Sequence, residues 1–121
     1  MRDIRIITGR TAKFDPDQTV RLLGCRPGSD SWEQTRNDVV ERMPVLRRLT
    51  RPKGAFVMEA DEGKTWIYAM MTLGKAVTDY IDRLGEDEDA SSALILNAMA
   101  DSCLFSFEEE LQQALRSFCH E

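Results

Sequence analysis

The stretch that decides the fold is residues 89–118, DASSALILNAMADSCLFSFEEELQQALRSF. Its apolar residues recur every three or four positions, which predicts a long amphipathic helix. A helix of this length extends for about 45 Å, whereas a compact chain of 121 residues is about 27 Å across. We therefore expect the distal stripe, from Phe107 to Phe118, to project past the core and to be covered by a second chain or by further sequence.

A β-hairpin is predicted upstream of this helix, over residues 54–71. Two apolar runs, 54–59 and 65–71, flank a turn-like segment at 60–64 that contains one glycine. The second run is apolar on both sides, which is typical of a central strand covered on both faces. Trp66 and Tyr68 alternate along this run and share a face. They are core aromatics in one interpretation and a ligand-stacking wall in the other.

The remaining residues predict one more strand and three shorter helices. The strand is expected over 3–8, and the helices are expected over 16–23, from about 31 to about 50, and from about 73 to 84. Together these elements predict an α+β fold, in which a small antiparallel sheet centred on the hairpin packs with helices, and a long C-terminal helix follows.

The ends of the first two of these helices are predicted from particular residues. Asp15 is expected to cap the first, and Gln18 to complete a capping box. Asp30 or Ser31 is expected to cap the second. Pro44 lies inside that second helix, and we expect a kink or break near Met43, because proline removes a backbone hydrogen bond and clashes with the preceding turn.

The third of these helices is expected to be capped by Thr72 and to end at Gly85. The acidic residues 86–89 that follow suit a loop and the first turn of the long helix, where negative charge is favourable.

Composition and charge limit the function classes. Hydrophobic residues make up 42% of the chain and charged residues 31%, an ordinary balance for one folded domain. The net charge of −5 argues against a nucleic-acid partner. Five cations nevertheless lie close together in one segment. This segment is either a solvated helix end or a binding site for an anion or an acidic partner. The five cations are Arg42, Arg47, Arg48, Arg51 and Lys53.

The cysteines and the apolar runs predict a cytoplasmic protein. Cys25, Cys103 and Cys119 form no CxxC pair and are odd in number. We expect no signal peptide, because Met1 leads almost directly into a strand-like run, and no uninterrupted apolar run approaches the ~20 residues of a membrane span. No membrane partner is expected.

The sequence predicts no catalytic residue and no metal site. His120 is the only histidine and lies beside the C-terminus, and no glycine-rich phosphate-binding motif occurs. Asp101 is unusual because it lies within the apolar half of the long helix. It is either on the outer face of that helix or a contact for a ligand or partner. Asp101, Trp66 and Tyr68 are the candidate binding residues.

Residues 92–110, SALILNAMADSCLFSFEEE, resemble the long helix of the activation domain of vitamin B12-dependent methionine synthase. An apolar stretch there leads to an Ala-Asp pair and then to an alanine- and glutamate-rich run. The segment 71–74, MTLG, resembles the strand-to-helix step of the short stand-alone proteins of the same superfamily. The same stand-alone proteins are also similar at residues 20–24 with Arg26, which match their opening helix, and at Arg51-Pro52, which precedes the hairpin. The match spans about residues 20–115, and the order of elements supports it.

The resemblance implies that residues 1–121 form one activation-domain-like domain, shortened relative to the family. It implies an association with cobalamin chemistry, in which such a domain binds S-adenosylmethionine and caps the cobalamin domain while cobalt is reduced and remethylated. A corrinoid protein or methyltransferase is the implied partner. Two departures argue against autonomous S-adenosylmethionine binding. The family's Arg-Pro-x-x-Gly-Tyr segment is missing, and Phe105 stands where the family has a ligand-contacting glutamate.

Three function classes therefore stay open. The first is an accessory domain for cobalamin-dependent methyl transfer without an active site of its own. The second is a non-catalytic homo-oligomerisation or protein-interaction module that uses the long helix. A stand-alone enzyme is the least supported, because the sequence offers no convergent set of titratable groups.

Overall fold

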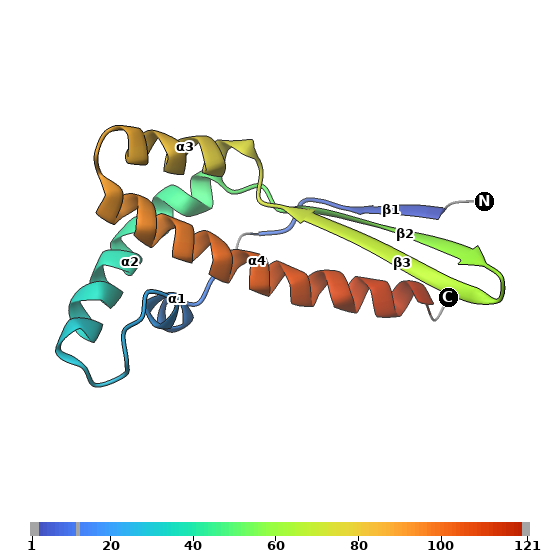
Figure 1. Cartoon of the computed structure of the whole chain (residues 1–121), viewed down its shortest axis with the longest axis horizontal. Coiled ribbons are helices and arrows are strands. Elements are labelled where there is room, and N and C mark those ends of the chain that lie inside the picture. Colours follow the sequence, from blue (N-terminus) through green and yellow to red (C-terminus); the bar gives the residue numbers. More distant parts are fainter. Residues whose placement is uncertain (1–2, 12, 120–121) are drawn as a thin grey trace.

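The computed structural model describes residues 3–11 and 13–119 and has the predicted α+β architecture (Figure 1). Its elements in chain order are β1 (Asp3–Ile7), α1 (Pro16–Leu22), α2 (Asp30–Leu49), β2 (Lys53–Asp61), β3 (Lys64–Thr72), α3 (Lys75–Glu86) and α4 (Ala90–Cys119). The three strands form one antiparallel sheet in the order β1-β2-β3.

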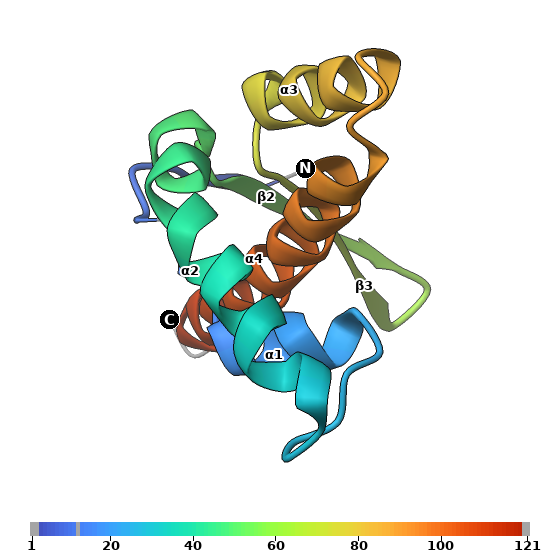
Figure 2. The same ribbon diagram turned by 90° about the vertical axis from the view of Figure 1, so that its left-hand side faces the viewer.

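Helix α4 runs the length of the molecule and joins two different halves (Figures 1 and 2). Its N-terminal half packs against α1, α2 and α3, and its C-terminal half packs against the sheet. The prediction of a long helix over 89–118 is confirmed to within one residue at each end. The core of the helical half is formed by the buried side chains of Val20, Val39, Leu46, Leu73, Val77, Ile95, Leu96, Met99, Ala100 and Cys103.

The distal half of α4 is covered by the sheet of its own chain. Phe107 and Leu111 are buried, and a Cβ on Gly54 would lie 3.0 Å from the ring of the first and 3.1 Å from the second. Phe118 packs between the ring of Phe56, at 5.3 Å, and the guanidinium of Arg5, at 4.5 Å. The expectation that this stripe needs a second chain is therefore wrong, because the strands project alongside the helix and cover it.

The predicted hairpin is confirmed, but the predicted place of its second strand at the centre of the sheet is not. The loop is two residues long, Glu62-Gly63, and both residues have positive φ angles, 48° and 77°, as a tight hairpin turn requires. Strand β2 is the central strand, whereas β3 is at the edge and exposed at all nine positions. The prediction of a central, doubly covered β3 is wrong, because β2 lies between β1 and β3, and α4 reaches only one face of the sheet.

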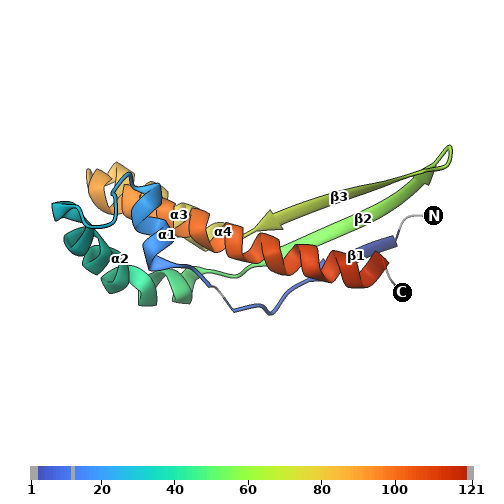
Figure 3. The same cartoon turned by 90° about the horizontal axis from the view of Figure 1, so that it is seen from below.

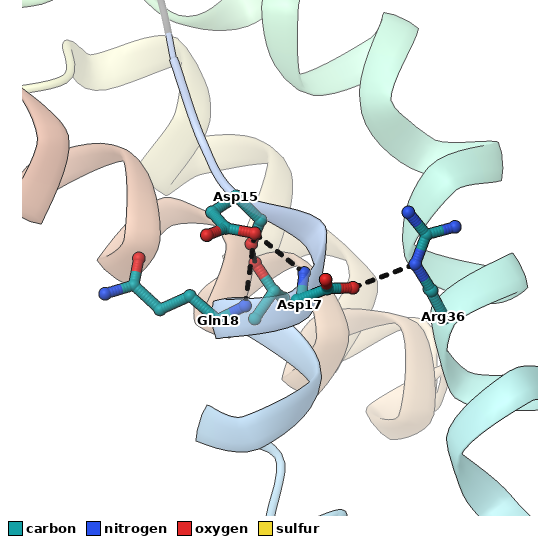
Figure 4. Close-up of polar contacts among 5 residues, drawn as sticks. Asp15, Asp17, Gln18 and Arg36 are labelled. Carbon is teal, nitrogen blue, oxygen red and sulfur yellow. Dashed lines mark hydrogen bonds and ion pairs between the residues drawn. The ribbon is translucent and has the colours of Figure 1, made fainter. Parts of the chain in front are cut away.

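Helix α1 begins with a cap that is only partly the predicted one (Figure 4). Asp15 accepts hydrogen bonds from the backbone N–H groups of Asp17 at 2.9 Å and Gln18 at 3.4 Å, as expected. The Gln18 side chain, however, accepts a hydrogen bond from the Ser102 hydroxyl on α4 at 2.7 Å, and that hydroxyl accepts one from the Asp15 N–H at 3.0 Å. The predicted capping box is wrong, since Ser102 replaces Gln18 as partner of the Asp15 N–H.

Helix α2 is continuous through its proline. Pro44 lies inside a 20-residue helix, so the prediction of a break near Met43 is wrong. The Pro44 side chain is exposed. The backbone carbonyl one turn earlier, which has no N–H partner because of the proline, can therefore accept a hydrogen bond from water. The helix is preceded by Ser29 as its N-cap, so neither Asp30 nor Ser31 is the cap.

Helix α3 also differs from the prediction at both ends. Thr72 does not cap it, because its hydroxyl accepts a hydrogen bond from the N–H of Gly74, and the helix begins one residue later. Gly85 lies inside the helix, which ends at Glu86. The chain reverses instead at Glu88, whose φ of 64° is left-handed.

Among the described residues, α4 is the one helix long and apolar enough by composition to cross a membrane. Of its most apolar stretch, 44% is buried inside the fold. The core helix of a folded domain meets the same criteria, so this observation does not assign the chain to a membrane.

Candidate functional site

The predicted binding residues lie on two separate surfaces. Asp101 is on α4 in the helical half, whereas Trp66 and Tyr68 are on β3 in the sheet half. The structure therefore does not combine them into one site. His120, the other residue considered at the sequence level, lies outside the described residues.

Asp101 lies at a groove between α3 and α4, where β3 ends. Asn97 and Asp101 are one helical turn apart on α4 and so line the same side, and Asp82 joins them from α3. All three side chains are exposed. The groove has a volume of about 300 Å³. Its other lining residues are Met71, Thr72, Leu73, Gly74, Val77, Thr78, Ile81, Ala100 and Leu104.

The chemistry of this groove favours a cationic or hydroxyl-bearing ligand over an anion. Its polar side chains are two carboxylates, one amide and two threonine hydroxyls, and no lysine or arginine lines it. The apolar floor formed by Val77 and Ala100 adds contact area for a hydrophobic ligand part. The sequence identified Asp101 as a candidate, whereas Asp82 was interpreted as an ion-paired or solvated residue beside Arg83, and Asn97 was missed. The four-residue spacing of Asn97 and Asp101 could have indicated Asn97.

Trp66 and Tyr68 lie on the side of the sheet that faces away from α4. They are 53% and 55% exposed, so the interpretation as core aromatics is wrong. In the strand register they share this side with Met70 on β3 and, across β2, with Ile4 and Ile6 on β1. These three are 76%, 63% and 62% exposed. Sequence reasoning missed all three as surface residues, although the alternation of Ile4 and Ile6 predicts a shared face.

The cations of residues 42–53 are largely engaged in holding the helical half together. Arg42 donates to the Ser92 hydroxyl at 3.0 Å and so links α2 to α4. Arg51 donates to the Thr50 carbonyl at 2.8 Å, where α2 ends. The guanidinium of Arg47 stacks over Phe14. Arg42, Arg47 and Arg51 therefore make contacts within the chain, which favours the interpretation of a helix end over that of an anion site.

Cys103 is a buried thiol in the helical core. Burial raises the pKa of the Cys103 thiol, a hydrogen bond from the Lys13 backbone lowers it, and the Glu110 carboxylate raises it. The net effect keeps the thiol protonated, which is the state of a packing residue rather than a nucleophile. Cys25, Cys103 and Cys119 are all free. In residues 3–11 and 13–119, no three His, Cys, Asp or Glu side chains are grouped as a metal site would require.

Comparisons with protein-family models, with curated proteins and with solved structures found no match to this chain. The resemblance to the methionine synthase activation domain therefore rests on the residues quoted above and stays a prediction.

Proposed function

We propose that this chain is a non-catalytic accessory domain that acts on a corrinoid protein, in the manner of the methionine synthase activation domain. The observation that carries the proposal is the groove at Asp101. Two separate segments that carry the resemblance, residues 71–74 and the pair Ala100-Asp101, line this one groove.

The arrangement of elements supports the same proposal. A 30-residue helix follows a hairpin and a short helix, in the order that the resemblance implies. The strand-to-helix step at Thr72–Gly74 has a hydrogen bond of its own, from the Gly74 N–H to the Thr72 hydroxyl, and Gly74 has a φ of 100° that favours glycine. This step forms one wall of the groove, and α4 forms the other.

A weak affinity for free S-adenosylmethionine is part of the proposal. The Asp101 carboxylate is of the right charge for the ligand's amino and sulfonium groups. Phe105, however, lies in a different hollow with Asp15, Gln18 and Arg21, and a phenyl ring accepts no hydrogen bond from an amino group. The chain therefore acts by contact with a corrinoid-loaded protein, in a cytoplasm that keeps its three thiols reduced.

Calorimetric titration with a purified corrinoid protein loaded with hydroxocobalamin tests this proposal, with the cobalamin absorption spectrum as a second readout. We expect binding heat and a spectral change, and we expect Asp101→Asn to weaken binding about tenfold through loss of a charged contact. Asp79→Asn is the matched control, because Asp79 is exposed on α3 and does not line the groove. Absence of heat and of any spectral change, with and without S-adenosylmethionine, would contradict the proposal.

A further inference from the structure

One face of the sheet is apolar and uncovered by any described part of the chain. We call it the outer sheet face, and it comprises Ile4, Ile6, Lys53, Ala55, Val57, Glu59, Asp61, Lys64, Trp66, Tyr68, Met70 and Thr72, by the strand register. Helix α4 packs on the opposite face and crosses in front of the sheet in Figure 3. The centre of the outer sheet face is apolar, and its charges lie at the two ends of the strands.

The size of this face is that of an interface rather than of an ordinary surface patch. Five of its apolar residues are more than half exposed: Ile4, Ile6, Trp66, Tyr68 and Met70. They present on the order of 700 Å² of accessible surface, which approaches the ~800 Å² that each partner buries in a stable complex. The largest apolar patch on a monomer is typically ~300–600 Å².

The two ends of the outer sheet face are complementary to each other in charge. Lys53 lies at the end next to the helical half, and Glu59, Asp61 and Lys64 lie towards the hairpin loop, where two carboxylates outnumber one cation. A two-fold axis that crosses the strands reverses their direction, so the Lys53 end of one copy meets the acidic end of another. A face that is complementary to itself in this way fits a second copy of the same chain.

The shape of the face follows the same symmetry. Tyr68 and Val57 pair in the middle row, with Met70 and Ala55 on one side of it and Trp66 on the other. An apolar hollow of about 170 Å³ lies at the Met70 end, lined by Lys53, Gly54, Ala55, Met70, Met71 and Thr72. A two-fold axis through the middle row places Trp66 of the second copy over this hollow, where an indole ring gains apolar contact.

We infer that the outer sheet face is a homodimer interface, in which two copies pack face to face about a two-fold axis that crosses the strands. The two three-stranded sheets then form a sandwich whose interior is the pair of outer sheet faces. This dimer does not depend on the corrinoid role, and it does not use the apolar stripe of α4, which the chain already covers itself.

Sedimentation velocity of the full chain from about 1 to about 200 μM tests the inference. We expect a dimer whose dissociation constant lies in this range, and we expect Tyr68→Asp to weaken it at least about a hundredfold, because the charge would be buried at the centre of the interface. Phe105→Asp is the matched control, since Phe105 is also half exposed but lies on α4, and it should leave the dimer unchanged. Circular dichroism must show that both variants are folded.

A charge exchange tests the two-fold arrangement itself. Lys53→Glu should weaken the dimer about tenfold, and adding Asp61→Lys should restore it. A wild-type monomer at the highest concentration, a dimer that tolerates Tyr68→Asp, or a double variant as weak as Lys53→Glu would each overturn the inference. A dimer that tolerates Tyr68→Asp would indicate pairing at the open β3 edge instead. Only this chain is present in the assay, so its outcome is separate from that of the corrinoid titration.

Discussion

The two halves of α4 differ in how completely the apolar residues around them are buried. In the helical half, α1, α2 and α3 surround the helix, and Met99 is 0% exposed. In the sheet half, one layer of strands covers Phe107 and Leu111, but the other side of that layer is open. A helix has one apolar stripe, and in the helical half the neighbouring helices bury it. A sheet has two faces, and in the sheet half α4 covers only one of them, so the other face stays exposed. We therefore assign most of the folding stability to the helical half and the contact with a second copy of the chain to the sheet half.

The largest expected difference is between two methionines, one in each half. Met99→Ala should lower the free energy of unfolding by about 2–5 kcal/mol, because it leaves a cavity in a closed core. Met70→Ala should change it by less than about 0.5 kcal/mol, because Met70 is on the outer sheet face. Urea unfolding at submicromolar protein, where a dimer dissociates, measures both. Equal losses would show that the sheet half is closed in the monomer.

Two glycines test the contact between α4 and the sheet. Gly54→Ala should cost about 1–3 kcal/mol, because its new methyl group would lie 3.0 Å from the Phe107 ring and 3.1 Å from Leu111, and both side chains would have to shift. Gly85→Ala should instead stabilise the chain by up to about 1 kcal/mol, because it is inside α3 with no atom within 4 Å of the added carbon. Thermal unfolding compares the two, and a neutral Gly54→Ala would mean that the sheet lies further from α4.

Ser102, which links α1 to α4, should have a smaller effect on the free energy of unfolding. Ser102→Ala should cost about 1–2 kcal/mol, because the Asp15 N–H and the Gln18 side chain each lose a buried partner. Ser117→Ala is the control, since Ser117 is exposed at the far end of the same helix. If the two variants unfold at the same urea concentration, the Ser102 hydrogen bonds contribute nothing to stability.

The smallest effect concerns pH and the buried thiol of Cys103. The pKa of this thiol is raised above its ordinary value of 9.0 in the folded chain, so the unfolded chain ionises first as the pH rises. The stability present below pH 9.0 is therefore lost progressively as the pH rises towards the folded pKa. We expect unfolding free energies, measured from about pH 7 to about pH 10, to fall more steeply for the wild type than for Cys103→Ala.

Local sequence patterns predicted the helices and strands well, because these elements depend on residues that are close together along the chain. The stripe of α4 follows from residue spacing, and the hairpin follows from the two runs around Gly63. The start of α1 follows from Asp15 and Pro16. These features need no knowledge of the rest of the fold.

What the sequence did not predict depends on contacts between distant segments. The apolar run of β3 is compatible with a central or an edge strand, and only the pairing of β1 with β2 decides between them. Ser102 takes the place of Gln18 at a cap 87 residues away. Gly54 permits the close approach of Phe107, which is why the distal stripe is covered without a second chain. Of the candidate binding residues, Asp101 was recognised by its context, whereas Asp82 required the packing of α3 on α4.

The two tryptophans of the chain, Trp32 and Trp66, allow the most direct test of the open sheet face. Trp66 alone remains in a Trp32→Phe variant, and its fluorescence and acrylamide quenching are measured while the protein is diluted. We predict that Trp66 becomes more accessible to acrylamide, with emission at longer wavelength, over the dilution range in which the dimer dissociates. Trp32, left alone by Trp66→Phe, should show no such change in the helical half. Equal quenching of Trp66 at every concentration would contradict the account.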